Sequence, residues 1–171
     1  MDALSFLGTT AETSVAFTGF ISVFFILARR TGSFHPVIAI SVRIILIAGI
    51  SCPFYSALPL ILLDAGVAES LVWRVSSGVV LAMATVINLY LFRRRNIYAP
   101  NVDRTTLFTA YSLNAITIVL PVANVIGFPF KPNSAAHLAT IWSILGIASV
   151  NFVGLVLYMI SRPDKADGNN G

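Results

Sequence analysis

The chain has 171 residues, of which 57% are hydrophobic and only 11% are charged, and its mean hydropathy is +0.86. Soluble domains carry about 25% charged residues, so this composition excludes an ordinary soluble domain and indicates a membrane protein. The net charge of +4 alone would suit a nucleic-acid-binding protein. Because the positive residues are explained below by membrane orientation and contact with anionic lipid headgroups, we expect no nucleic-acid partner.

Five long apolar segments follow one another along the chain. A helix needs about 20 mostly apolar residues to cross about 30 Å of hydrocarbon. None of the segments alternates apolar and polar residues, as a membrane-spanning β-strand would. The sequence therefore predicts an all-α fold, a polytopic transmembrane helix bundle that forms a single membrane domain over residues 1–160. The predicted spans are Ala11–Ala28, Pro36–Leu63, Glu69–Phe92, Thr105–Gly127 and Ala135–Ile160.

The basic residues between the spans lie almost entirely on one side of the predicted bundle. Eight of the 11 follow the first, third or fifth span, whereas the opposite side has only Arg74 and Lys131. Positively charged loops stay in the cytoplasm, so the N-terminus is predicted outside and the C-terminus in the cytoplasm, with the chain in a plasma membrane. Residues 161–171 are polar and rich in Gly and Asn, which predicts a disordered cytoplasmic tail.

Local signals predict how the first two helices begin and bend. Thr9 and Glu12 have the S/T-x-x-E spacing of a capping box, so the first helix is expected to open at Thr9. Pro36 suits the first turn of the second helix. Pro53 and Pro59 are expected to kink the outer half of that helix, because a proline removes a backbone donor.

The fourth and fifth spans carry polar residues at helical spacing. Asn114, Thr117, Pro121 and Asn124 are spaced three, four and three residues apart and therefore share one face of the fourth span. A related stripe on the fifth span consists of Thr140, Ser143, Asn151 and Gly154. Either these amides join helices by hydrogen bonds, with Asn114 and Asn151 facing each other or another helix at one depth, or they line a water-filled pore. Helix packing is favoured, because no acidic ring accompanies the amides to select a cation.

Charged residues within or beside the spans are functional candidates, because a charge in hydrocarbon is costly. Arg43 lies inside the second span, and its stem is long enough to reach the cytoplasmic headgroups. Glu12 and Arg74 both lie near the outer boundary of the membrane. We expect these two residues to form an ion pair, which would lower the cost of an arginine in the outer leaflet.

The sequence has no recognisable catalytic or metal-binding pattern. His35 and His137 fall at opposite ends of the bundle, and the lone Cys52 lies in the middle of a span as a small buried hydrophobe. No GxSxG, HExxH, CxxC or Walker motif occurs. We expect a non-enzymatic membrane-embedded subunit or interaction protein without a cofactor or metal. A small homo-oligomeric channel or transport component, and an intramembrane enzyme or cofactor carrier, are the alternatives.

Two stretches, ETSVAFTGF at residues 12–20 and ESLVWRVSS at residues 69–77, resemble segments of small, uncharacterised bacterial integral-membrane proteins. The resemblance covers about a tenth of the chain. It implies a location in a bacterial inner membrane and implies no activity or site. The expected partners are therefore the lipid bilayer and either a second copy of the chain or another membrane subunit.

Overall fold

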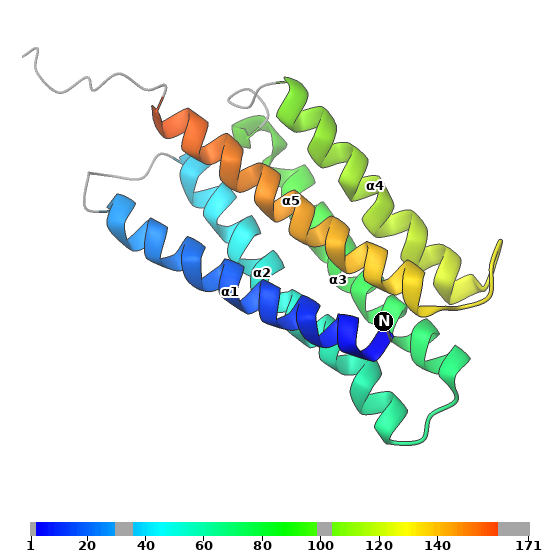
Figure 1. Cartoon of the computed structure of the whole chain (residues 1–171). Coiled ribbons are helices and arrows are strands. Elements are labelled where there is room, and N and C mark those ends of the chain that lie inside the picture. Colours follow the sequence, from blue (N-terminus) through cyan, green and yellow to red (C-terminus); the bar gives the residue numbers. More distant parts are fainter. Residues whose placement is uncertain (1–2, 30–35, 99–103, 161–171) are drawn as a thin grey trace, which may run out of the picture.

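A computed structural model describes residues 3–29, 36–98 and 104–160, which contain five helices (Figure 1). The helices are α1 (Ala3–Arg29), α2 (Pro36–Asp64), α3 (Glu69–Tyr98), α4 (Arg104–Ile126) and α5 (Ser134–Ile160). Within these described ranges, all five are long and apolar enough to cross a membrane. The predicted all-α fold with five membrane-length helices is thus confirmed, and the tail predicted at 161–171 lies outside the described residues.

Four of the helices form a ring, in which α2 packs on α3, α3 on α4, α4 on α5, and α5 on α2. The remaining helix, α1, lies along the outside of the ring against α2 and touches α5 (Figure 1). The short connections 65–68 and 127–133 lie at the end where α1 begins, which we call the turn end. At the other end, the basic end, the described helices carry Arg29, Arg93 and Arg104.

The first helix begins six residues before the predicted start. Thr9 and Glu12 lie inside α1, so the predicted capping box is wrong. In place of a capping contact, the Thr9 hydroxyl donates to the Ser5 carbonyl one turn earlier, over 3.1 Å. A hydroxyl in an apolar helix satisfies itself in this way without breaking the helix. The same bond to the preceding turn is made by Thr10, Thr13, Ser14, Thr18 and Ser22.

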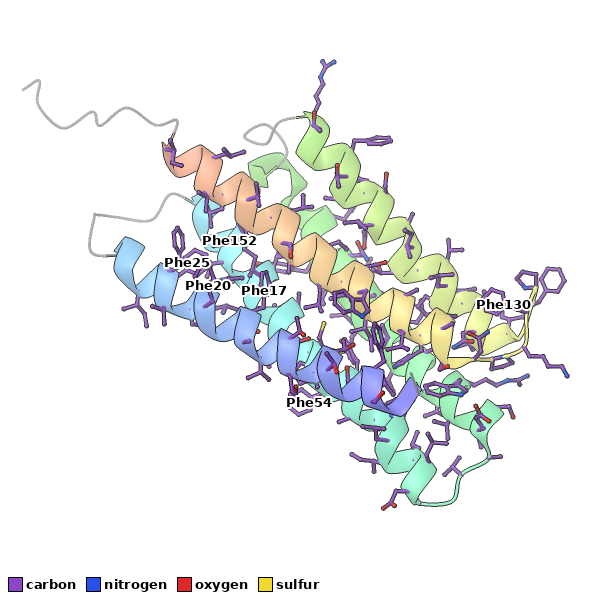
Figure 2. All side chains as sticks on the ribbon, viewed as in Figure 1. Phe17, Phe20, Phe25, Phe54, Phe130 and Phe152 are labelled. Atoms are coloured by element: carbon purple, nitrogen blue, oxygen red, sulfur yellow. The ribbon has the colours of Figure 1, made fainter. Side chains whose placement is uncertain are left out.

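The packing of α1 on the ring depends on one close approach and one aromatic cluster. A β-carbon at Gly49 of α2 would overlap with the Thr18 Oγ1, so only glycine lets the two helices come this close. Nearer the basic end, Phe24 meets Phe152 of α5 edge to face, with ring centroids 5.2 Å apart. Figure 2 shows the neighbouring Phe20 and Phe25 in the same region. Together these contacts hold α1 on the α2–α5 side of the bundle.

The two turns at the turn end are closed by glycines with positive φ. Gly66 (φ 77°) follows α2 and Gly127 (φ 79°) follows α4. The Gly127 N–H donates to the Ala123 carbonyl over 2.8 Å, which satisfies one of the free carbonyls of the helix end. Asn133 then caps α5, because its Oδ1 accepts the Ala136 N–H over 3.0 Å.

Candidate functional site

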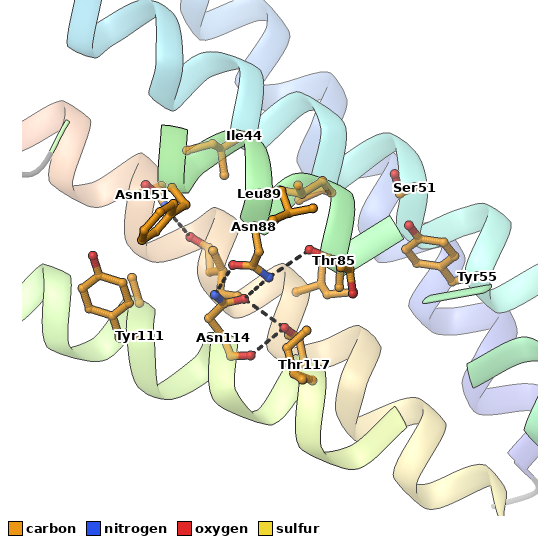
Figure 3. Close-up of a pocket in the computed structure, with 18 residues that line it drawn as sticks. Ile44, Ser51, Tyr55, Thr85, Asn88, Leu89, Tyr111, Asn114, Thr117 and Asn151 are labelled. Carbon is orange, nitrogen blue, oxygen red and sulfur yellow. Dashed lines mark hydrogen bonds between the residues drawn. The ribbon is translucent and has the colours of Figure 1, made fainter. Parts of the chain in front are cut away.

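A cavity of about 690 Å³ lies inside the ring, between α2, α3, α4 and α5 (Figure 3). It lies mostly in the half of the bundle nearer the basic end and reaches past the middle at Tyr55 and Ile144. Asn151, one of its lining residues, is nine residues before the end of α5, a depth of about 13 Å. Most of the wall is aliphatic or aromatic. The polar side chains that line it are Ser51, Tyr55, Thr85, Asn88, Tyr111, Asn114, Thr117 and Asn151.

An amide pair bridges α3 and α4 at the wall of this cavity. Asn88 Nδ2 donates to Asn114 Oδ1 over 3.1 Å, and Asn114 Nδ2 donates back to Asn88 Oδ1. The Thr117 hydroxyl adds a bond of 3.1 Å to the same Asn114 Oδ1 and one of 2.8 Å to the Asn114 carbonyl. Figure 3 shows the three side chains meeting at the centre of the site. Both asparagines remain half-buried, so the pair presents polar atoms to the cavity.

The predicted polar stripes lie on the faces expected for them. Thr117 and Asn124 of α4 are fully buried, as are Thr140 and Asn151 of α5. The helix that Asn114 contacts is nevertheless α3. Asn151 Nδ2 donates to the Ile147 carbonyl of its own helix over 2.8 Å and lines the same cavity.

Asn88, the partner of Asn114, was missing from the sequence prediction. Asn88 is the single amide within the membrane-length segment Glu69–Tyr90, so no periodicity reveals it. One signal was available: Asn88 lies ten residues before the end of α3, and Asn114 lies ten residues after the start of α4. In two consecutive antiparallel helices, such positions fall at the same depth.

A second polar cluster fills the bundle between the cavity and the turn end. We call it the turn-end network, and it consists of Tyr55, Ser77, Asn124, Asn133 and His137. Asn124 Nδ2 lies 2.8 Å from the Ser77 hydroxyl, Ser77 Oγ lies 3.4 Å from His137 Nδ1, and His137 Nε2 lies 3.0 Å from the Tyr55 carbonyl. The network therefore ties together all four helices of the ring.

Pro59, one of the two prolines in α2, explains why the network has this form. Pro59 has no N–H, so the Tyr55 carbonyl four residues earlier lacks its helical donor. His137 Nε2 must carry a proton to donate to this carbonyl, and in the neutral imidazole Nδ1 then accepts from the Ser77 hydroxyl. Ser77 in turn accepts from Asn124. The donor directions agree along the whole chain of bonds, with a neutral imidazole at its centre.

Asn124 also fixes the turn between α4 and α5. Its Oδ1 accepts the Asn133 N–H over 2.8 Å, and its Nδ2 donates to the Asn133 carbonyl over 3.1 Å. Asn124, one of the residues of the predicted stripe, therefore has a structural role. It holds the start of α5, and with it His137, in register against Ser77.

The charged candidates lie on the surface of the bundle, away from the cavity wall. Arg43 is exposed, and its Nη1 donates to the Tyr90 hydroxyl of α3 over 3.3 Å. Glu12 is exposed on α1, whereas the guanidinium of Arg74 lies beside Gly127, where a β-carbon would be 3.2 Å from Nη2. The predicted Glu12–Arg74 ion pair is absent from the described residues, because α1 packs on α2 and α5 and turns Glu12 outward.

In the part of the chain that the structure describes, the other residues with reactive or metal-binding side chains do not form a cluster. Cys52 is buried in an apolar core cluster with Trp73 and Ile141. Among the described residues, no group of three or more His, Cys, Asp or Glu side chains could hold a metal ion. The hydroxyls of Ser56 and Ser76 are buried without a hydrogen-bond partner in the described structure.

The site is thus an apolar cavity with an amide-lined wall, closed toward the turn end by a hydrogen-bonded network. Comparison of the chain with protein-family models, with curated proteins and with solved structures gives no match.

Proposed function

We propose that the protein is a non-enzymatic, multi-pass membrane protein that binds a small lipophilic molecule in the cavity between α2, α3, α4 and α5. The cavity carries the proposal. Its volume of about 690 Å³ falls within the range of roughly 300–1,000 Å³ that is typical of small-molecule sites. Such sites combine an apolar wall with a few convergent polar groups. Here the convergent groups are Asn88, Asn114, Thr117 and Asn151.

Two features favour binding over the alternatives. The described lining residues are apolar residues, amides, hydroxyls and phenols, so the wall offers hydrogen bonds without a carboxylate, imidazole or thiol to act as acid, base or nucleophile. Toward the turn end, the buried side chains of Trp73, Asn124, His137 and Ile141 occupy the interior of the bundle. A continuous water path through one chain would have to break this packing, which disfavours a channel within the monomer.

The orientation predicted from the sequence belongs to the same proposal. With the basic end in the cytoplasm, the cavity lies in the inner half of a plasma membrane. Reporter fusions after Asp64 and after Lys131 should then score as external, and a fusion after Arg95 as cytoplasmic. A cytoplasmic score after Asp64 would reverse the assignment.

The binding proposal can be tested by filling the cavity. Ala110 lines the cavity, whereas Ala115, on the same helix, is exposed and does not. Native mass spectrometry of the full chain in mild detergent should detect a retained small molecule on the wild type and on the control Ala115→Phe. Ala110→Phe should lose it, because the added ring occupies its space. Equal retention by both variants, or none on the wild type, would reject the proposal.

A membrane-embedded subunit or interaction protein is the second candidate, and the outer surface of α1 favours it. Glu12 is exposed there within the apolar span Ser5–Ile26, and a β-carbon at Gly8 or Gly19 would meet nothing within 4 Å. An unpaired carboxylate in a span is costly and calls for a partner helix. In native membranes, Ala16→Cys in a Cys52→Ala background should then form cross-links that Glu12→Gln weakens. Unchanged cross-linking in Glu12→Gln would remove this candidate.

A further inference from the structure

The cavity opens sideways between α3 and α4, as the faces of these two helices reveal. Gly78, Thr85, Leu89 and Phe92 are spaced seven, four and three residues apart and share one face of α3. Near the turn end this face meets α4, since a β-carbon at Gly78 would lie 3.8 Å from Val125. Toward the basic end the same face is more exposed: Leu89 is 58% exposed and Phe92 is 64% exposed.

The face of α4 that lies opposite is likewise exposed toward the basic end. Val125, Ile118 and Tyr111 lie seven residues apart and therefore point the same way. Tyr111 nevertheless is 63% exposed and lines the cavity. The two helices thus contact each other near the turn end, whereas the residues of these faces nearer the basic end, beside the Asn88–Asn114 pair, are exposed and line the cavity. Leu89 and Tyr111 lie within the membrane-length segments Glu69–Tyr90 and Phe108–Ile126, and Phe92 lies two residues beyond the first of them. A molecule therefore reaches this opening from the acyl region of a bilayer.

The wall chemistry restricts what kind of polar group such a molecule carries. Asn88 and Asn114 present amide donors and acceptors, and Asn151 contributes a third amide from α5. No side chain with a formal charge is among the described lining residues. A phosphate, carboxylate or ammonium group placed here would be desolvated without a counter-charge, which is strongly unfavourable. A hydroxyl or carbonyl group needs only hydrogen bonds, and amides provide both donor and acceptor.

We propose that the ligand is an uncharged lipid with a hydroxyl or carbonyl at its polar end. It enters between α3 and α4, its polar end bonds to the Asn88–Asn114 pair, and its hydrocarbon part fills the apolar remainder of the cavity. This inference rests on the proposed binding function and adds the chemical class of the ligand. Arg43 is not among the lining residues, and its Nη1 donates to the Tyr90 hydroxyl.

The test uses three photoreactive probes of equal chain length: a 16-carbon alcohol, its phosphate monoester and the corresponding alkane. Each carries a diazirine at the same mid-chain carbon. The full chain is reconstituted in phosphatidylcholine vesicles, irradiated, and mapped by peptide mass spectrometry. The alcohol should label peptides containing the lining residues of α3 and α4 roughly tenfold more than the phosphate ester does, because the wall offers that ester no cation.

Two double variants test the amide pair. Asn88→Leu/Asn114→Leu should lower labelling of the cavity by the alcohol about fivefold to tenfold, the loss expected for one or two net hydrogen bonds. Labelling by the alkane should not change. The control Ser112→Leu/Ala115→Leu alters exposed α4 positions outside the lining set and should behave like the wild type.

The outcomes separate this inference from the function on which it rests. If the alkane and the phosphate ester label the wild-type cavity as well as the alcohol does, the ligand class is wrong while binding stands. If none of the three probes labels the cavity peptides, both proposals fail. Should the Asn88→Leu/Asn114→Leu variant not fold, the comparison of the three probes on the wild type still decides the ligand class.

Discussion

His137 Nε2 donates to the Tyr55 carbonyl over 3.0 Å, across the contact between α5 and α2. Pro59 deprives this carbonyl of its own helical donor, so a side chain from another helix replaces the missing N–H. In hydrocarbon an unsatisfied carbonyl costs several kcal/mol. This single hydrogen bond therefore contributes substantially to the stability of the bundle. It anchors the turn-end network and with it the closed end of the cavity.

The first prediction concerns this replacement. His137→Phe leaves the Tyr55 carbonyl without a donor and Ser77 without its acceptor, and should lower the free energy of unfolding in detergent by about 2–4 kcal/mol. Pro59→Ala restores a backbone N–H at residue 59 and should recover part of that loss in the His137→Phe background. A double-mutant cycle by thermal or denaturant unfolding measures the coupling. Equal losses from His137→Phe with and without Pro59→Ala would contradict the explanation.

The second prediction concerns the amide pair of the cavity wall. Asn114→Leu leaves Asn88 Oδ1 without its donor, and Asn88→Leu leaves Asn114 Nδ2 without its acceptor, so each should cost about 1–3 kcal/mol. The double variant removes both amides together and should cost less than the sum of the single losses. Steric trapping or detergent denaturation supplies the free energies. Strict additivity would mean that the two amides do not depend on each other.

The five helices follow from the sequence, because hydrophobic length is a property of single segments. The predicted starts of α2 and α3 at Pro36 and Glu69 match the structure. The start of α1 was wrong, because Thr9 and Glu12 have the spacing of a cap yet lie in a helix whose hydroxyls bond to the preceding turn.

The site was less accessible to prediction, because its contacts join distant parts of the chain. His137 and Tyr55 are 82 residues apart, and their bond depends on a proline in one helix and an imidazole in another. The polar stripe on α4 was visible because it repeats, whereas Asn88 on α3 stands alone. The cavity itself lies between four helices, and no periodicity within a single helix predicts how four helices pack.

The third prediction compares two glycines in membrane-spanning helices. A β-carbon at Gly49 would overlap with Thr18, whereas one at Gly19 would meet nothing within 4 Å. Gly49→Ala should therefore force α1 away from α2 and cost about 1–3 kcal/mol. Gly19→Ala, as the matched control, should be neutral or slightly stabilising, because alanine favours a helix by up to about 1 kcal/mol. Similar unfolding free energies for both variants would contradict the close approach of α1 and α2.

The fourth prediction concerns the two surface charges that do not meet. Because Glu12 faces outward on α1 and Arg74 lies beside Gly127, no direct bond couples them within one chain. Glu12→Gln and Arg74→Gln should be additive in the stability of the detergent-solubilised monomer, to within about 0.5 kcal/mol. A larger coupling energy between the two substitutions in the monomer would show that Glu12 and Arg74 do form an ion pair. A coupling seen only in an oligomer would place the pair between chains.

The most direct measurement of the central claim is cysteine labelling along the polar stripe of α4, because it distinguishes a lipid-facing binding cavity from a water-filled pore. Cysteines are placed at residues 114, 117 and 121 in a Cys52→Ala background and exposed to a lipid-soluble or a charged, water-soluble thiol reagent. The binding account predicts that the lipid-soluble reagent reaches residues 114 and 117, that a 16-carbon alcohol slows this reaction, and that the charged reagent reaches none of the three. Rapid reaction of all three with the charged reagent would contradict the account and establish a channel.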